Sequence, residues 1–317
     1  STATTTMFQF YFGDGTLSGI TMVISFLPMF VFIPFVRKLV NAMGKKEACA
    51  LGTIISFIGT LFLLNPNITP DQNGIISFMI GLCIFGFGMG FYTCISWSLM
   101  ADAIADDRLI SVYGGGGHTT LPVGEMFFRA GGLSCINPIM ETGLSVFNQA
   151  LKYLELERTV NYGSAIMKYY DLKKDDVLII FHNIGINPAT IDAAMEAKSR
   201  GVKIIAVSSS AWQAEMPKEH FIRHPNKTNL FDYADVCIDD FNPVGDAVVN
   251  VPGLDTPIAP VSNIIDFYIA HLLEIETVKQ CIERGIIPPV WSSANTPGGD
   301  EKNAAYLEKY KPRVKML

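Results

Sequence analysis

The chain has 317 residues, with 24 basic and 30 acidic side chains and a formal net charge of −6. It carries no basic stripe, which excludes nucleic acid as an expected partner. The charges are unevenly spread, because residues 1–100 hold only four basic and three acidic side chains and the rest of the chain holds the other 20 and 27. The sequence therefore predicts a lipid-embedded first part and a soluble second part.

Three apolar runs occupy the first part, at 19–36, 48–64 and 74–100. Each is close to the ~20 residues that a helix needs to span a bilayer, and none contains a charged residue. We therefore expect three transmembrane helices, since buried helices of a soluble core would normally carry a polar face. Four basic residues within 37–46 predict a cytoplasmic loop, and a third crossing then puts the second part in the cytoplasm.

The first part also carries a series of short motifs: Tyr11-Phe12-Gly13-Asp14, Pro34 with Arg37-Lys38, Gly44-Lys45-Lys46, Gly86 to Gly90, and Trp97 to Asp102. In this order they resemble part of the glycoside-pentoside-hexuronide:cation symporters, a branch of the major facilitator superfamily. Such transporters have twelve helices in two halves, and residues 1–107 match only about three of them. The resemblance ends after Ala101-Asp102, where the family's Asp-Tyr-Gly-Glu pattern is not followed. We expect a partial transporter-like membrane segment.

The second part alternates strand and helix patterns in the way that is typical of an α/β domain with a parallel sheet. Helical patterns lie at 143–170 and 189–200, and another follows the glycine run to residue 130. The continuous apolar run Val177–Phe181 predicts a central strand that is covered on both faces. The five predicted strands are 109–113, 133–137, 177–182, 203–208 and 235–239.

Ligands of such folds bind at the carboxyl ends of the strands. Three polar or glycine-rich segments of this chain are predicted to meet there, at 114–119, 182–187 and 208–210. Consecutive glycines let backbone N–H groups approach an anion closely. The glycine run lacks the G-x-G-x-x-G spacing of dinucleotide sites, so no cofactor is expected. The candidate ligand-binding residues are Gly115, Gly116, Gly117, Thr119, His182, Asn183, Gly185, Asn187, Ser208, Ser209 and Ser210.

Two separated motifs, Arg129-Ala130-Gly131-Gly132-Leu133 and Ser293 to Glu301, resemble those of SIS (sugar isomerase) domains. The resemblance covers nearly all of 108–317, which we therefore expect to form one domain. It implies a flavodoxin-like five-stranded parallel sheet, a phosphorylated sugar as ligand, frequent homodimerisation and, in enzymatic members, aldose–ketose isomerisation. One departure stands out, because the Ser-x-Ser-Gly loop common in these domains is replaced by His182-Asn183-Ile184-Gly185, which lacks both hydroxyls.

Isomerisation needs a base that moves a proton between adjacent sugar carbons and an acid that assists ring opening. The candidates are Glu125 and His118, which lie near the start of the first helix. The simpler alternatives are a Glu125–Arg129 pair at i,i+4 spacing and a loop histidine. His271, on a late helix, is a surface histidine or reaches the site of a partner subunit.

The six cysteines include no CxxC pair, so neither zinc nor a disulfide framework is expected. Three functions stay open: a sugar-phosphate isomerase, a sugar-phosphate sensor without catalysis, and a fragment of a sugar:cation symporter with the SIS domain as an appendage. The junction near residue 107 is either a natural membrane tether or the product of joining two separate genes.

Overall fold

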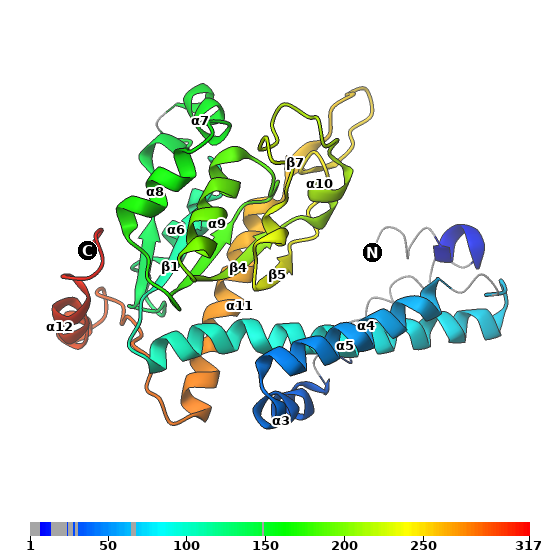
Figure 1. Cartoon of the computed structure of the whole chain (residues 1–317), viewed down its shortest axis with the longest axis horizontal. Coiled ribbons are helices and arrows are strands. Elements are labelled where there is room, and N and C mark those ends of the chain that lie inside the picture. The colour runs from blue at the N-terminus through cyan, green and yellow to red at the C-terminus, as the bar shows by residue number, and fades with distance from the viewer. Residues whose placement is uncertain (1–6, 14–23, 25–27, 29–30, 65–67, 148) are drawn as a thin grey trace. The chain divides into compact units, whose positions relative to one another are not determined.

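A computed structural model describes residues 7–13, 24, 28, 31–64, 68–147 and 149–317. The chain divides into two units, Ser1–Ser96 and Trp97–Leu317. One long helix, α5 (Gln72–Ala105), passes through this division (Figure 1). The domain boundary predicted after residue 107 stays a proposal.

The described helices of the first unit are α3 (Ile33–Met43), α4 (Lys45–Leu63) and the first part of α5. Gly44 joins α3 to α4 with a φ of +93°, which glycine adopts without a steric penalty. A short π-helical turn at Met7–Tyr11 precedes them, and its Phe8 packs with Phe78 of α5.

Among the described residues, one helix is long and apolar enough to cross a membrane, judged by length and composition alone: Gln72–Phe91 of α5. The second predicted span does not reach that length, because α4 begins with a charged turn and its apolar part is only Ala50–Leu63. The first predicted span, 19–36, lies largely outside the described residues. Of the three predicted spans, the structure therefore supports one.

The second unit is built on a five-stranded sheet in which every pairing is parallel, with the order β2-β1-β3-β4-β5. This is the flavodoxin-like order, and it confirms the predicted fold class. Pro138 is tolerated in β2 because that strand lies at the edge of the sheet. The strands are β1 (Ile110–Gly114), β2 (Ile136–Ile139), β3 (Val177–Phe181), β4 (Lys203–Ser208) and β5 (Val236–Asp239).

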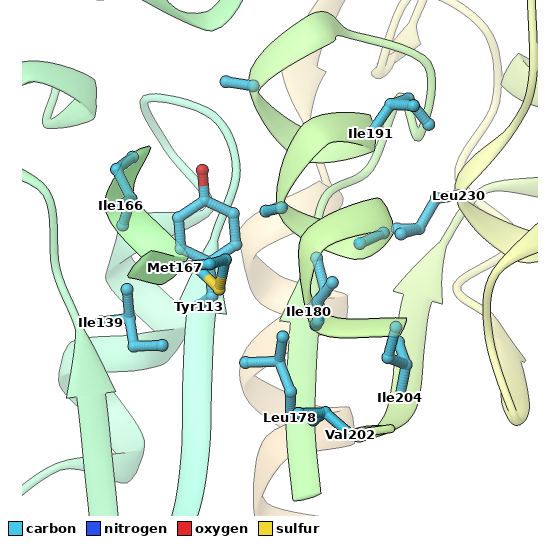
Figure 2. Close-up of a cluster of buried hydrophobic side chains, with 14 of the residues drawn as sticks. Tyr113, Ile139, Ile166, Met167, Leu178, Ile180, Ile191, Val202, Ile204 and Leu230 are labelled. Carbon is cyan, nitrogen blue, oxygen red and sulfur yellow. The ribbon is translucent and has the colours of Figure 1, made fainter. Parts of the chain in front are cut away.

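Both faces of the sheet are covered. Tyr113, Leu178 and Ile180 point toward α8 and α9 and pack there with Met167 and Ile191 (Figure 2). Strand residues that point the other way, such as Ile110 and Val112, are also fully buried. The helices of this unit are α6 (Thr120–Met126), α7 (Ala150–Glu157), α8 (Tyr162–Tyr170), α9 (Pro188–Ser199), α10 (Ser210–Glu215), α11 (Ser262–Glu283) and α12 (Gly299–Tyr310). A small hairpin joins β6 (Ala247–Val249) to β7 (Ile258–Pro260).

Candidate functional site

The glycine run forms a tight, buried loop at the carboxyl end of β1. The Gly115 N–H donates to the carbonyl of Phe181 at 3.1 Å, which ties the loop to the end of β3. The Thr119 hydroxyl oxygen accepts from the Gly116 N–H at 2.9 Å and closes the turn before α6. The predicted meeting of the β1 and β3 ends is therefore present, and the side chains of Thr190, His182 and Tyr153 pack closely against the loop.

His182 packs directly against this loop. Its side chain is buried, and its Nδ1 accepts a hydrogen bond from the Gly185 N–H at 2.8 Å. Burial lowers the pKa of His182 to about 3, so the ring is neutral and carries its proton on Nε2. A Cβ atom added at Gly116 would lie 3.1 Å from Nε2. The imidazole therefore presents an N–H donor to the glycine loop.

The residues after His182 are fixed by protein contacts. Asn183 accepts a hydrogen bond on Oδ1 from Asn242 Nδ2 at 2.9 Å. Gly185 has a φ of +66°, and a Cβ atom there would lie 2.8 Å from the Gln213 amide nitrogen, so glycine is required. Asn187 is buried at the start of α9 and donates through Nδ2 to Glu157 Oε1 at 3.1 Å. Glu157 was not among the predicted site residues.

The three serines at the carboxyl end of β4 have hydroxyl groups that are hydrogen-bonded to other groups of the protein. Ser208 Oγ donates to the Asn183 carbonyl at 3.3 Å, and Ser209 Oγ donates to the Asn242 carbonyl at 2.6 Å. Ser210 is exposed, and its hydroxyl bonds to the carboxylate of Asp239. These hydroxyls brace the ends of β3, β4 and β5, and their predicted contact with ligand stays a prediction.

Glu125 and His118, the predicted acid–base residues, have different partners. Glu125 Oε1 lies 3.2 Å from Arg129 Nε, the expected i,i+4 pair, and 3.3 Å from His271 Nε2 on α11. His118 is exposed on the glycine loop and makes an edge-on ring contact with Tyr153. The structure thus places His271 beside Glu125 within one chain, where a partner subunit was the predicted alternative.

A second carboxyl group, that of Glu274, contacts the other nitrogen of the His271 ring. Glu274 lies one turn after His271 on α11, with Oε2 3.5 Å from His271 Nδ1. Its side chain is buried, burial raises its pKa to about 7, and the Leu133 N–H that donates to it opposes the rise. The i,i+3 spacing of His271 and Glu274 is a sequence signal that could have marked this cluster.

Three further acidic residues lie near the carboxyl end of β5 and the start of α11: Asp240, Asp246 and Asp266. Asp266 is completely buried, and neither of its carboxylate oxygens has a protein hydrogen-bond partner. Burial and the charges of Asp240 and Asp246 raise its pKa well above the ordinary 3.8. Among the residues that the structure describes, no three histidine, cysteine or acidic side chains are placed to hold a metal ion. Because both carboxyl oxygens of Asp266 are buried without a partner, its surroundings favour the protonated, uncharged form.

Replacing Asp266 with asparagine is expected to stabilise the second unit above pH 4. The raised pKa means that the folded state keeps a proton that the unfolded state releases, so ionisation costs stability as pH rises above 3.8. The cost grows by about 1.4 kcal/mol per pH unit until the folded-state pKa is reached. Thermal melting of Asp266→Asn should therefore show a gain of several degrees at pH 8 and a smaller gain at pH 5. Asp255→Asn, at an exposed position, is the control, and an equal gain at both pH values would contradict the account.

Two family models match the chain. A model described as SIS domain matches residues 96–209, and one described as MFS/sugar transport protein matches residues 3–111. The two matches overlap at the end of α5 and the start of β1. Each confirms one of the two resemblances found in the sequence.

The alignments with curated relatives cover most of the length of each relative. A UPF0309 protein of Thermoanaerobacter pseudethanolicus is 37% identical over 227 residues, which are 71% of this chain and 89% of that protein. A UPF0309 protein of Caldanaerobacter subterraneus subsp. tengcongensis is 36% identical over 216 residues, covering 68% and 86%. One of Geobacillus thermodenitrificans is 31% identical over 218 residues, covering 69% and 86%. With the SIS match and the five-stranded parallel sheet, these relatives show that the chain belongs to the UPF0309 family of SIS-type proteins.

Proposed function

We propose that the second unit binds a phosphorylated sugar at the glycine loop, which follows β1 and lies beside the end of β3. The observation that carries the proposal is the neutral His182 ring, whose edge with Cδ2 and Nε2 lies against Gly116 of the buried loop. The imidazole offers an anionic oxygen a hydrogen-bond donor that needs no charge. The match to SIS domains, which bind phosphosugars, supports the same ligand class.

We further propose that the bound sugar is isomerised with Glu125 as the base. The carboxylate would remove the proton from the carbon beside the carbonyl group and return it to the adjacent carbon, so that no proton is gained or lost overall. His271, 3.3 Å from Glu125 and itself supported by Glu274, would orient the carboxylate, and His118 at the exposed edge of the loop would protonate the ring oxygen.

For the first unit we propose a role as membrane tether that leaves residues 108–317 in the cytoplasm. The apolar stretch Gln72–Phe91 and the match to MFS/sugar transport proteins support membrane association. The basic residues between 37 and 46 support the orientation. We also propose that the chain forms a homodimer through its SIS domain, as the resemblance implies, which light scattering of the full chain would test.

Sugar-phosphate binding is expected to raise the melting temperature of the full chain. A ligand present at a hundredfold its Kd stabilises the folded state by ~2.7 kcal/mol, which corresponds to roughly 5–10 °C for a domain of this size. The screen would compare glucose 6-phosphate and fructose 6-phosphate with glucose and fructose. A shift with the phosphorylated pair alone supports the proposal. Equal shifts with both pairs, or none, would refute it.

A further inference from the structure

Glu157, the last residue of α7, places its carboxyl group at the glycine loop. A Cβ atom added at Gly116 would lie 3.2 Å from Glu157 Oε2 and 3.1 Å from His182 Nε2, so both side chains border the same backbone. The other carboxyl oxygen, Oε1, accepts a hydrogen bond from Asn187 Nδ2 at 3.1 Å. The side chain of Glu157 is buried. An acidic group thus lies at the place that the proposed function assigns to a phosphate.

One face of α7 is turned toward the loop. Tyr153, one turn before Glu157, packs its ring against Gly117, where an added Cβ atom would lie 2.6 Å from the ring. The same ring contacts His118 edge-on, at a centroid distance of 6.3 Å. Leu151 and Glu155, by contrast, are exposed to solvent. Glu157 therefore lies on the same face of α7 as Tyr153, which packs against the loop.

Glu157 is the buried group at this loop that changes charge near neutral pH, and His118 is the exposed titratable side chain of the same loop. Burial raises its pKa to about 7, against the opposing effects of Arg158 and the Asn187 amide. His182 stays neutral because burial lowers its pKa to about 3. The phenols of Tyr153 and Tyr113 stay protonated because burial raises their pKa values.

The neighbouring helix α9 adds one more titratable group, Asp192, whose negative charge contributes to the raised pKa of Tyr113. Burial raises the pKa of Asp192, while the Asn161 N–H and His224 at 3.1 Å oppose the rise. Its hydrogen-bond partners are thus Asn161 and His224, whereas Glu157 is bonded to Asn187.

We propose that Glu157 belongs to the ligand site and that its carboxylate takes up one proton from solvent when a phosphate ester binds in the glycine loop. The carboxylate becomes a carboxylic acid, whose O–H donates a hydrogen bond to a phosphate oxygen, and no bond to phosphorus forms or breaks. An ionised carboxylate would instead repel the phosphate dianion at short range. The inference rests on the proposed function, because it concerns the same anion site.

Proton uptake can be measured by titration calorimetry of the full chain with glucose 6-phosphate, in buffers of different ionisation enthalpy at pH 7, 8 and 9. Phosphate monoesters have a second pKa near 6, so the ligand itself stays a dianion over this range. The wild-type chain is expected to take up about one proton per ligand at pH 8, and its Kd should rise about tenfold per pH unit above 7.

Glu157→Gln and Glu155→Gln separate the two side chains of α7. The glutamine at 157 keeps the shape and offers a permanent N–H donor, so its Kd should be independent of pH with no proton uptake. Glu155→Gln, at an exposed position on the same helix, should behave as the wild type. Melting temperatures would show that both variants fold.

The outcomes distinguish this inference from the function on which it rests. Binding by the wild type with a Kd that does not change from pH 7 to 9 and without proton uptake would overturn the role of Glu157 and leave sugar-phosphate binding intact. A pH dependence that persists in Glu157→Gln would overturn it as well. Absence of binding in the wild type and in both variants would overturn both proposals.

Discussion

Gly114→Ala is expected to destabilise the second unit strongly and to abolish ligand binding. An added Cβ atom would lie 2.5 Å from the carbonyl carbon of Thr119 and 2.7 Å from the nitrogen of Thr120. Both are backbone atoms of the turn that the Thr119 hydroxyl closes, so neither can move without opening the loop. Overpacking of this kind costs about 1–3 kcal/mol or more, which is a large share of the stability of one domain.

Thermal melting of the full chain, with and without glucose 6-phosphate, would measure both effects. Gly124→Ala is the matched control, because it lies within α6 and an added Cβ atom meets only Met140 Cε at 3.8 Å. Alanine favours a helix over glycine, so this variant should melt at the same temperature as the wild type or up to a few degrees higher. A Gly114→Ala chain that melts and binds like the wild type would contradict this prediction, because it would mean that the loop can accommodate a Cβ atom at residue 114.

The central strands could be predicted from the sequence because their pattern is set by burial alone. The predicted 203–208 coincides with β4, and 177–182 overruns β3 by one residue. The edge strand was less predictable, since Leu133 forms an isolated antiparallel bridge with Val290 and β2 begins only at Ile136. That bridge joins residues far apart in the chain, so no local sequence pattern predicts it.

The helix predicted at 143–170 is in fact two helices, α7 and α8. The break lies at Asn161, which has a φ of +70° and whose N–H donates to Asp192 Oδ2. Tyr162 then donates its hydroxyl to Glu141 Oε1 at 2.9 Å. Asn161 tolerates the left-handed conformation, but its partner comes from α9, so a tertiary contact overrides local helix propensity. The predicted continuation of α6 to residue 130 likewise ends at Met126, before Phe128 with a φ of +53°.

The site was predictable where it follows from sheet topology and not where it follows from helix packing. Parallel strands bring their carboxyl ends to one edge, which is why the glycine loop and His182 could be placed together in advance. Glu157 and Asp266 carry no such signal, because an acidic residue in a helix is usually solvated. Their burial is decided by the elements that pack over α7 and α11.

The end of α5 explains why the SIS match begins at residue 96, before the predicted boundary. Arg284 of α11 pairs with Asp102 at 2.6 Å and donates to Ser98 Oγ at 2.9 Å. Thr277, also on α11, donates to the sulfur of the buried Met100 at 3.4 Å. The last turns of this apolar helix are therefore part of the second unit, and the residues matched by the two family models share one continuous helix.

Glu125→Gln is expected to lower turnover of a bound sugar phosphate by about 10²- to 10⁴-fold, the usual loss when a positioned general base is removed. The amide keeps the shape of the carboxylate and its place beside Arg129 and His271, so the Kd for the sugar phosphate should change little. Conversion of glucose 6-phosphate to fructose 6-phosphate by the full chain, with calorimetric binding on the same samples, gives both quantities.

Glu276→Gln is the control for this substitution, since Glu276 lies on α11 in a surface pair with Lys279 and away from Glu125's contacts. It should retain both turnover and affinity. If the wild type binds the sugar phosphate but converts none of it, and Glu125→Gln binds equally well, the domain is a sensor and Glu125 is a structural partner of Arg129. If Glu125→Gln retains full turnover, the base lies elsewhere. Only a loss of turnover at unchanged affinity supports the proposed chemistry, because that pattern requires an interaction made in the transition state alone.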